Sequence, residues 1–317
     1  MWRSSAARQG RCVDWNSPYI ENWIRAALTE NAAIDDVWLA ASIPAQAQGK
    51  AHIVASQDLI CAGLPLVERI YRALDAEMKV ELEVGDGREV IAGAEILHLD
   101  GAAAAILKGE RTALNFLRQL SGIATLTQQF VKKIDGTRAK ISGTLKTTPG
   151  MGFLEKYAVQ TGGGAGHRIR PSILLTESHI AFAGGIKAAL DQAHSFASSR
   201  MKLPAITAYE AVGVTPSEVE AGSLLVQIEV QSVSELREAL SAGAEAVLFA
   251  SMTLEQAREY VAIVRGVRPD CIVEISGAIT VANVRAYAET GADLLSPDEL
   301  IRSAPYGEFR LLVDSVK

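Results

Sequence analysis

From residue 139 onward the chain alternates short apolar runs with amphipathic segments, and this alternation constrains the fold more than any other feature. Runs such as "AEAVLFAS" (244–251) and "CIVEISGAI" (271–279) predict buried strands, whereas "TLEQAREYVAIVRGV" (253–267) predicts a helix. Strands that alternate with helices of about 10–15 residues form βαβ units with a parallel sheet. The same alternation predicts further elements at 139–145, 172–177, 184–197, 223–230, 232–243, 280–291 and 292–297. We therefore predict a barrel or partial barrel, whose functional residues lie at the C-terminal ends of the strands.

The first hundred residues follow a different pattern. A Ser-Pro start followed by apolar residues at helical spacing predicts a helix over residues 17–30, and "LPLVERIYRALDAE" (64–77) predicts an amphipathic helix. Between about residues 50 and 107, apolar and polar residues alternate around Gly-Asp-Gly turns, which predicts short antiparallel strands. A helix over residues 110–134 then leads into the alternating region.

One segment breaks the alternation. Residues 199–223, "SRMKLPAITAYEAVGVTPSEVEAGS", combine Pro, Gly and acidic residues with little periodicity. An irregular stretch of this length inside a compact domain is typical of a lid or of a disordered insert. We expect a partly ordered surface insert.

Composition and charge exclude several classes of function. Apolar residues make up 49% of the chain and aromatic residues only 6%, which is typical of an α/β enzyme with aliphatic buried strands. A net charge of −6 without a basic stripe argues against a nucleic-acid partner. No apolar run reaches about 18 residues, so we expect no membrane span. Cys12, Cys61 and Cys271 lie far apart, which argues against a cysteine metal site or disulfide framework and favours a reduced, cytoplasmic setting.

The predicted strand ends carry candidate anion-binding groups. Lys146 follows a predicted strand and precedes Pro149–Gly150, so we expect its ammonium group at the functional rim, either on a phosphate or as an ordinary rim lysine. The run "TGGGAGHR" (161–168) offers closely spaced backbone N–H groups, although many glycine runs are only tight turns. His167–Arg168 strengthens the anion-binding interpretation, because arginine holds a carboxylate in a bidentate manner and histidine adds a donor.

Two further strand ends are candidates. An unpaired carboxylate at Glu229, in a predicted core strand, would be costly, so it either binds a metal ion or pairs with a cation. Ser276–Gly277 ends another strand just before a predicted helix, which suits a phosphate but is weak evidence alone. His179, also at a strand end, fits a site or a structural role equally. Two further histidines, His52 and His98, are expected to be ordinary half-buried residues of the N-terminal strands.

Five segments resemble quinolinate phosphoribosyltransferase, the decarboxylating nicotinate-nucleotide pyrophosphorylase: "GERTALNFLRQLSGIATLT" (109–127), "KTTPG" (146–150), "LEKYAVQTGGGAGHR" (154–168), "IEVQSVSELREALSAGAEAVLFASM" (228–252) and "EISGAITVANVRAYAETGADLLS" (274–296). The resemblance runs from about Tyr19 to Ala304. It implies an N-terminal α/β sandwich at residues 17–108, on which the tail at about 304–317 packs, and an incomplete α/β barrel at residues 109–303. It also implies a homodimer in which the partner completes each active site, and we expect a homodimer or a higher even oligomer.

The family's reaction joins quinolinate to phosphoribosyl pyrophosphate with Mg²⁺ and gives nicotinate mononucleotide, carbon dioxide and pyrophosphate, a step of NAD biosynthesis. By resemblance, Arg111 reaches into the neighbouring subunit's quinolinate pocket, and His167–Arg168 contacts the substrate carboxylates. Lys146 matches a lysine near the reacting groups, and Glu229 matches a carboxylate beside the metal. Ser276–Gly277 matches part of the 5′-phosphate loop.

Several positions depart from the family pattern. Where the family has DTRKT this chain has "GTLKT" (143–147), so an aspartate is Gly143 and a carboxylate-binding arginine is Leu145. The other replacements are Thr176 for a pocket lysine, Ala250 for a second metal-side aspartate, Asp298 for a phosphate-loop glycine and Arg302 for a histidine.

The effect of these replacements on the free energy of ligand binding can be predicted. Each charge-assisted hydrogen bond to an anion contributes roughly 1.5–3 kcal/mol, so Leu145 and Thr176 together should weaken dicarboxylate binding by roughly 3–6 kcal/mol, about 100-fold to 10,000-fold. Asp298 should repel a phosphate, unless Arg302, four residues later, neutralises it across a helical turn.

Two hypotheses follow. The first is a phosphoribosyltransferase of this family that acts on a pyridine carboxylate, slowly or with a less acidic acceptor. The second is a diverged paralogue that binds a small anion or a partner subunit without turnover. The first explains why the matching cations and Glu229 occur together, and the second explains why the replacements cluster at the site.

Overall fold

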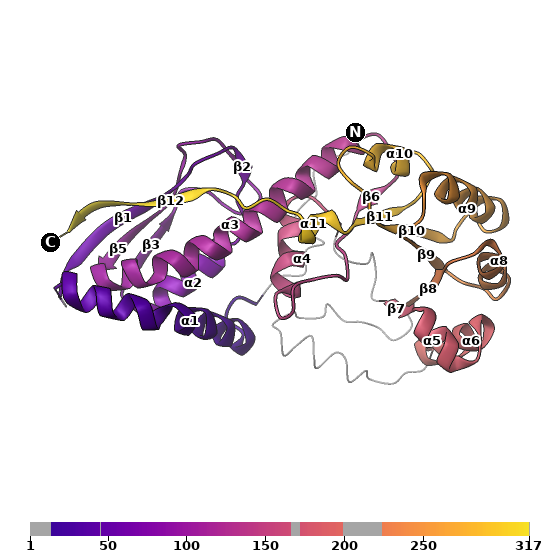
Figure 1. Cartoon of the computed structure of the whole chain (residues 1–317), viewed down its shortest axis with the longest axis horizontal. Helices are drawn as coiled ribbons and strands as arrows, with labels where there is room; N and C mark the ends of the chain where they lie inside the picture. Colours follow the sequence, from indigo (N-terminus) through magenta and orange to yellow (C-terminus); the bar gives the residue numbers. More distant parts are fainter. Residues whose placement is uncertain (1–13, 45, 166–171, 199–223, 317) are drawn as a thin grey trace.

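The computed structural model describes residues 14–44, 46–165, 172–198 and 224–316. Two lobes lie along the long axis of the molecule and are joined by one long helix, α3 (Ala103–Lys133) (Figure 1). No helix in the described part of the chain is long and apolar enough to cross a membrane.

The first lobe is built on a four-stranded antiparallel sheet in the order β12-β1-β5-β3. Its strands are β1 (Gln48–Ala55), β3 (Lys79–Leu82), β5 (Glu95–Ala102) and β12 (Phe309–Val316), and a small second sheet pairs β2 (Leu59–Ile60) with β4 (Glu89–Val90). The helices α1 (Pro18–Ser42) and α2 (Leu64–Leu74) and the first half of α3 lie on one face of the larger sheet (Figure 1). Side chains alternate across β1, so Ala51 and Ile53 are buried while Lys50 and His52 lie on the other face.

The second lobe is a six-stranded sheet in the order β6-β11-β10-β9-β8-β7, in which every described pair is parallel. Its strands are β6 (Lys140–Ile141), β7 (Ser172–Leu175), β8 (Leu225–Val230), β9 (Ala246–Ala250), β10 (Ile272–Gly277) and β11 (Leu294–Pro297). The accompanying helices are α4 (Gly152–Thr161), α5 (Glu177–Ala183), α6 (Ile186–Ser198), α8 (Val233–Ser241), α9 (Leu254–Val267), α10 (Val284–Ala288) and α11 (Glu299–Arg302). The fold class predicted from the sequence, an N-terminal α/β domain followed by an incomplete parallel α/β barrel, is confirmed.

The βα units form where the sequence supplies both a buried strand and a helix cap. In β9, Val247 and Phe249 are fully buried, and the Phe249 ring meets Tyr260 of α9 edge-on at 5.5 Å between ring centroids. At the start of α9, the Thr253 hydroxyl accepts a hydrogen bond from the Gln256 N–H, while the Gln256 side chain accepts one from the Thr253 N–H. This capping box fixes where the helix begins.

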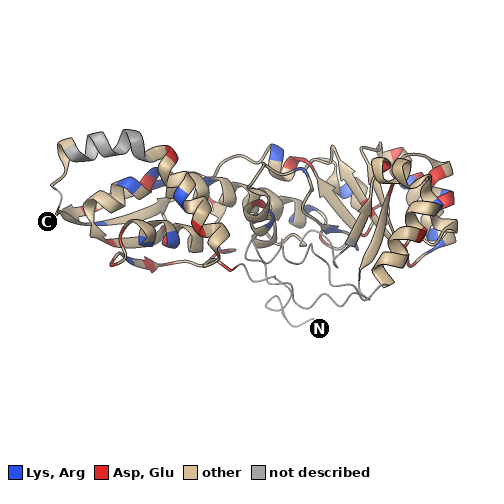
Figure 2. Ribbon diagram, turned by 90° about the horizontal axis from the view of Figure 1, so that it is seen from below, with Lys and Arg blue, Asp and Glu red and all other residues tan. Residues whose placement is uncertain are grey.

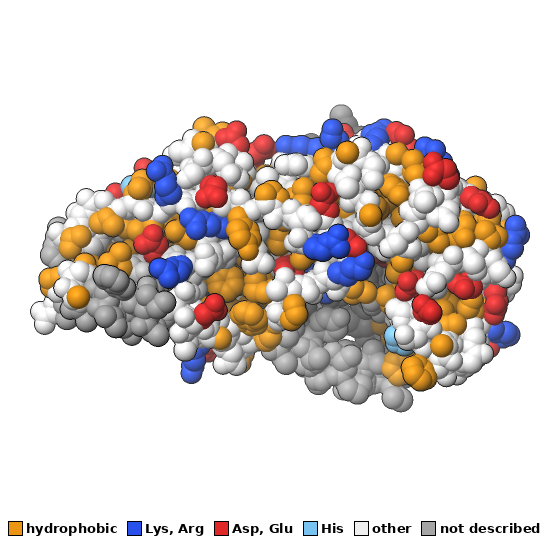
Figure 3. Space-filling model, viewed as in Figure 1, with side chains coloured by type: hydrophobic (Ala, Val, Ile, Leu, Met, Phe, Trp, Pro, Cys, Tyr) orange, Lys and Arg blue, Asp and Glu red, His pale blue; other side chains and the backbone are white. Residues whose placement is uncertain are grey.

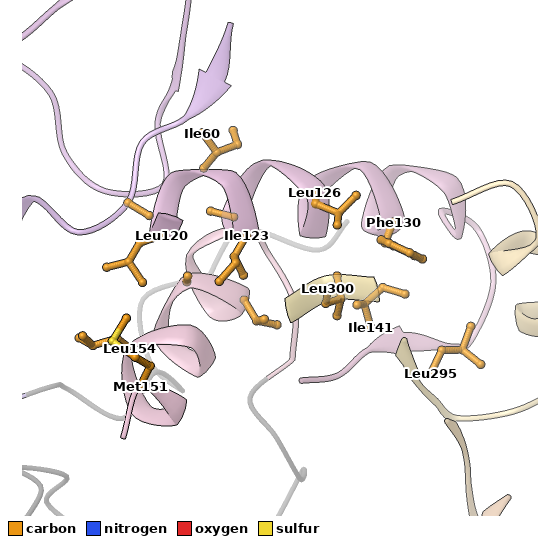
Figure 4. Close-up of a cluster of buried hydrophobic side chains, with 14 of the residues drawn as sticks. Ile60, Leu120, Ile123, Leu126, Phe130, Ile141, Met151, Leu154, Leu295 and Leu300 are labelled. Carbon is orange, nitrogen blue, oxygen red and sulfur yellow. The ribbon is translucent and has the colours of Figure 1, made fainter. Parts of the chain in front are cut away.

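Helix α3 carries the hydrophobic core from one lobe to the other. Its apolar face packs on β2, on α4, on the β6–β11 edge of the parallel sheet and on α11 (Figure 4). The side chains in this cluster include Ile60, Leu120, Ile123, Leu126, Phe130, Ile141, Met151, Leu154, Leu295 and Leu300. The cluster is continuous, so one core connects the first lobe to the β6–β11 edge of the second.

A second link between the lobes comes from the Gly-Asp-Gly turn at residues 85–87. The Asp86 carboxylate accepts hydrogen bonds from the Gly63 and Leu64 N–H groups at the start of α2, at 2.8 and 3.0 Å. It also accepts one from the Tyr157 hydroxyl of α4 at 2.5 Å. Burial raises the pKa of Asp86. The turn therefore connects α2 to the helix that follows the Lys146 loop.

Some element boundaries differ from the sequence prediction. α3 begins at Ala103 rather than at residue 110, so the predicted domain boundary at 108/109 lies inside this helix, and α1 continues to Ser42. The strand predicted at 139–145 is regular only over Lys140–Ile141, and Ser142 adds an isolated parallel bridge to Ala165. The chain then turns, and the Thr144 hydroxyl accepts a hydrogen bond from the Lys146 N–H. The tail pairs antiparallel with β1 as β12. The insert predicted at 199–223 lies outside the described residues.

Basic and acidic residues are interspersed along the helices of both lobes (Figure 2). On the face shown in Figure 3, cationic, anionic and apolar side chains are likewise mixed.

Candidate active site

The carboxyl ends of β8, β9 and β10 bring sequence-predicted positions onto one face of the parallel sheet. Ser276 in β10 lies opposite Ala250 at the end of β9 and opposite Ser296 in β11. Side chains alternate along a strand, and Val273 and Ile275 are fully buried on the helix side, so Ser276 points to the inner face. This is the edge where functional residues of α/β barrels gather.

A buried polar network supports this face from below. The Glu274 carboxylate, 5% exposed, accepts a hydrogen bond from the Gln227 side-chain amide at 2.7 Å and another from the Ser296 hydroxyl. These residues belong to β8, β10 and β11. Because the partners satisfy the buried carboxylate, the network ties the three strands together beneath the strand ends.

Lys146 and Asp298 meet at the rim of the site. The Lys146 ammonium lies 2.6 Å from Asp298 Oδ2, and the lysine side chain is 66% exposed while the aspartate side chain is only 11% exposed. Asp298 occupies the N-cap position of the short helix α11 without a side-chain capping hydrogen bond, and it donates its backbone N–H to the Gly277 carbonyl at 3.1 Å. The loop that carries Lys146 is itself held, because the Thr148 N–H donates to the buried Glu155 carboxylate at 3.0 Å.

The Asp298 carboxylate is therefore only half satisfied. Its Oδ1 is buried and has no hydrogen-bond partner among the described residues. The turn that contains Asp298 and Arg302 is helical, as the neutralisation hypothesis required, but the aspartate pairs with Lys146 instead, and Arg302 is exposed. The Asp298 carboxylate thus binds the Lys146 ammonium, which is then not available to a substrate anion.

Glu229 lies on the same face of β8 as Gln227, and the pKa of its carboxyl group is raised. Desolvation raises its pKa, the nearby charge of Glu177 raises it further, and Lys146 lowers it. Glu177 begins α5, directly after β7, and its Oε2 accepts a hydrogen bond from the Gln231 side chain at 3.0 Å. Two carboxylates and one ammonium group therefore share a small region at the strand ends.

The turn after β10 has a tightly constrained backbone. Gly277 has a φ of +122°, and a Cβ added there would lie 3.0 Å from both the Cα and the N of Ser251. Ser251 itself has a φ of +56°, and its N–H donates to the Ser276 carbonyl at 2.9 Å. A side chain at position 277 would disrupt this close approach, so the sequence needs glycine here.

The replaced positions differ in their surroundings. Leu145, next to Lys146, is 50% exposed, which is unusual for a leucine. Thr176 precedes α5, and its N–H donates to His179 Nδ1 at 3.3 Å, while its hydroxyl lies 2.7 Å from the same nitrogen. The structure therefore gives His179 a structural contact at the start of α5.

The remaining predicted site residues do not join this cluster within the described part of the chain. Arg111 is exposed on the first half of α3, which packs in the first lobe. His167 and Arg168 lie outside the described residues.

Sequence reasoning missed Glu177 and Ser251. Ser251 directly follows β9, and Glu177 follows β7 after one intervening residue, so the rule that functional residues lie at strand ends would have selected both. The pattern gave no sign that Lys146 would pair with Asp298, because the two residues are 152 positions apart in the chain.

The raised pKa of Glu229 predicts a pH-dependent stability effect. A carboxyl group whose pKa is higher in the folded chain costs stability above that pKa, and the cost vanishes below the unfolded value of about 4.3. We expect Glu229→Gln to raise the free energy of unfolding by about 0.5–1 kcal/mol near pH 8, a modest gain because solvent screens this partly exposed group. Near pH 4 the two proteins should unfold at the same urea concentration. A gain of equal size at both pH values would contradict this interpretation.

Comparison with known proteins places the whole chain in one group. Residues 30–121 match the family described as quinolinate phosphoribosyl transferase, N-terminal domain, and residues 123–212 and 205–312 match its C-terminal domain. The chain is 31% identical over 289 residues, 90% of each chain, to the probable nicotinate-nucleotide pyrophosphorylase (carboxylating) of Synechocystis sp.. It is 32% identical over 249 residues, 78% of this chain and 77% of the relative, to that of Bacillus subtilis.

Two solved structures are similar to this chain over nearly its whole length. The crystal structure of NadC from Streptococcus pyogenes superposes with a TM-score of 0.76 at 29% identity and covers 94% of this chain and 96% of its own. The nicotinate-nucleotide pyrophosphorylase from Francisella tularensis superposes with a TM-score of 0.76 at 27% identity and covers 99% and 100% of the two chains.

Proposed function

Because the chain belongs to the quinolinate phosphoribosyltransferase family, we propose that it transfers the phosphoribosyl group of phosphoribosyl pyrophosphate to a pyridine carboxylate. With quinolinate as acceptor, the products are nicotinate mononucleotide, carbon dioxide and pyrophosphate. The observation that carries this proposal is the location of Lys146, Glu229 and Ser276–Gly277 at strand ends of one parallel sheet, after β6, in β8 and in β10.

The reaction sets clear requirements for these groups. The pyridine nitrogen forms a bond to the anomeric carbon of the ribose while the bond from that carbon to pyrophosphate breaks. The ring carboxylate next to the nitrogen then leaves as carbon dioxide, and its ring carbon takes up a proton. Negative charge builds on the departing pyrophosphate, so an ammonium group such as that of Lys146 stabilises it most at that stage. The constrained backbone at Ser276–Gly277 suits close approach to a phosphate.

The carboxylates fit a magnesium ion. Glu229 and Glu177 lie close enough for each charge to act on the other, and Mg²⁺ is commonly held by one or two carboxylates together with substrate phosphates. We propose that these two residues hold it, with Glu177 standing in for the carboxylate that Ala250 lacks. When bound, the ion neutralises charge on pyrophosphate. Glu229 must be ionised for this role, and its raised pKa makes the ionised form sensitive to a neighbouring cation.

The acceptor pocket supports a less acidic acceptor than quinolinate. Leu145 offers an apolar side chain where a dicarboxylate would gain most from a cation, and Thr176 is engaged with His179. We propose that a pyridine monocarboxylate is the preferred acceptor and that quinolinate is a weaker one.

We further propose a homodimer in which Arg111 completes the partner's site. Its support is that Arg111 is exposed in the first lobe, whereas the strand-end groups lie in the second. We expect Arg111→Ala and Lys146→Ala each to be inactive, and their mixture after unfolding and refolding to recover about a quarter of wild-type activity. Random pairing makes half of the dimers mixed, and each mixed dimer has one site free of both substitutions. A mixture as inactive as its components would rule out sites shared in this way.

A steady-state assay tests the proposed reaction. Chain, Mg²⁺ and phosphoribosyl pyrophosphate are incubated with nicotinate or with carboxyl-labelled quinolinate, and nicotinate mononucleotide, pyrophosphate and released label are measured. Lys146→Ala is the control for a contaminating enzyme. If neither acceptor yields mononucleotide, the proposal is wrong.

One observation favours the second hypothesis, binding without turnover. The Lys146–Asp298 ion pair sets a carboxylate where a substrate anion would need the lysine. In this case phosphoribosyl pyrophosphate would bind weakly and remain intact.

A further inference from the structure

Far from the strand ends, two histidines face each other on the open side of the first lobe's sheet. His52 of β1 and His98 of β5 are directly opposite in register, with ring centroids 5.8 Å apart and ring planes inclined by 38°. Asp314 of β12 places its Oδ1 2.7 Å from His52 Nδ1. Three strands, including the last of the chain, therefore contribute to one cluster.

The sheet itself fixes the orientation of these side chains. Ile53 and Leu97, adjacent to the histidines, are fully buried on the helix side, so His52 and His98 point to the opposite face. Their side chains are 16% and 36% exposed, which leaves them partly desolvated yet within reach of solutes.

A bulge places the third member. Lys50 pairs with Ser315 whereas Ala51 pairs with Val313, so Asp314 is the extra residue of β12 at this point. Bulges redirect a side chain and are common at sheet edges, and here the carboxylate turns toward His52.

We propose that His52, His98 and Asp314 bind a divalent transition-metal ion of the Zn²⁺ class. One ligand atom from each residue lies within 4.8 Å of the others. Tetrahedral Zn²⁺ with bonds of about 2.0–2.1 Å needs ligand atoms about 3.3 Å apart, a change that small side-chain rotations supply. Two imidazoles and a carboxylate suit Zn²⁺ or Co²⁺, whereas Mg²⁺ prefers oxygen ligands alone, so this site differs chemically from the strand-end carboxylates. Water would fill the fourth position.

The surroundings favour a cation. The carboxylates of Glu95 and Glu83 lie 3.3 and 3.6 Å from His98 Nε2. Carboxylates next to a histidine orient its ring and strengthen it as a metal ligand. Together with Asp314, they bring three carboxylates to the two histidines, and a divalent ion would compensate this negative charge.

Binding would have a structural consequence. Asp314 belongs to the C-terminal strand, 262 positions after His52. An ion held by both would fasten β12 to the centre of the sheet and stabilise the folded chain in proportion to the ion's concentration.

Titration of the full chain with Co²⁺, followed by its visible absorption, tests the site. We expect one equivalent to bind with a tetrahedral d–d spectrum, Zn²⁺ to displace it, and His98→Asn and Asp314→Asn each to weaken Co²⁺ at least ~10-fold. Lys50→Gln is the matched control, because Lys50 lies on the same strand and face as His52 and its partner is Asp100. The Lys50→Gln variant should bind Co²⁺ as the wild type does, and Zn²⁺ should raise the melting temperature of this variant.

Three outcomes would overturn the proposal: no tetrahedral spectrum, an unchanged titration in both ligand variants, or equal weakening in Lys50→Gln. Circular dichroism of each variant separates lost binding from lost folding. If one ligand variant is unfolded, the other decides the result.

Discussion

Asp298→Asn is expected to tighten the binding of phosphoribosyl pyrophosphate by about 10- to 100-fold. The substitution removes the carboxylate that holds the Lys146 ammonium at 2.6 Å and keeps the size of the side chain. The lysine can then make one charge-assisted hydrogen bond to the substrate, which contributes roughly 1.5–3 kcal/mol. The substitution also removes the negative charge of a buried carboxylate whose Oδ1 has no hydrogen-bond partner among the described residues. Calorimetry with Mg²⁺ present measures the effect.

The matched control is Asp191→Asn. Asp191 pairs with Lys187 on α6, also at 2.6 Å, but this pair is well exposed and belongs to a single helix. Its loss should leave substrate affinity unchanged. If Asp298→Asn binds no better than wild type, Asp298 positions Lys146 for the substrate and does not compete with it.

Leu145→Arg combined with Thr176→Lys is expected to strengthen quinolinate binding at least ~10-fold. Two new charge-assisted contacts could contribute roughly 3–6 kcal/mol, but introduced side chains are rarely pre-organised, so we expect only part of this gain. Leu145 is half exposed, so an arginine can extend from this position without overpacking a core. The lysine at 176 forfeits the hydroxyl contact with His179, at a cost of about 1 kcal/mol to the start of α5.

A charge-matched control separates a local effect from a change in net charge. Leu82→Arg with Val267→Lys adds the same two cations at exposed apolar positions of β3 and α9. This control should bind quinolinate as wild type does. An equal gain in the two double variants, or no gain in Leu145→Arg with Thr176→Lys while it remains folded, would show that the acceptor does not lie against these positions.

The fold was predictable because its pattern is local. Buried parallel strands such as β9 and β10 are nearly continuous apolar runs, and caps such as Thr253 mark where the helices begin. The carboxyl ends of parallel strands meet at one edge of the sheet, where functional residues are expected. This expectation selected Glu229, Ser276 and Gly277.

What escaped prediction depends on contacts between distant residues. Spacing along the chain favoured Arg302 as the partner of Asp298, but the tertiary fold brings Lys146 closer. The effect of Glu177 in α5 on Glu229 in β8, and the contact of Asp314 with His52, likewise depend on residues of separate elements. His52 and His98, expected to be ordinary histidines, face each other only because of the register between β1 and β5.

A single-turnover experiment tests the central claim, that Lys146, Glu229 and Ser276–Gly277 form a phosphoribosyl-transfer site, most directly. The chain is held in excess over phosphoribosyl pyrophosphate, with Mg²⁺ and a saturating pyridine carboxylate, and the quenched mixture is analysed over time. The predicted result is equal amounts of pyrophosphate and nicotinate mononucleotide, formed at least ~100-fold more slowly by Lys146→Ala. Recovery of intact phosphoribosyl pyrophosphate from a chain that demonstrably binds it would contradict the account.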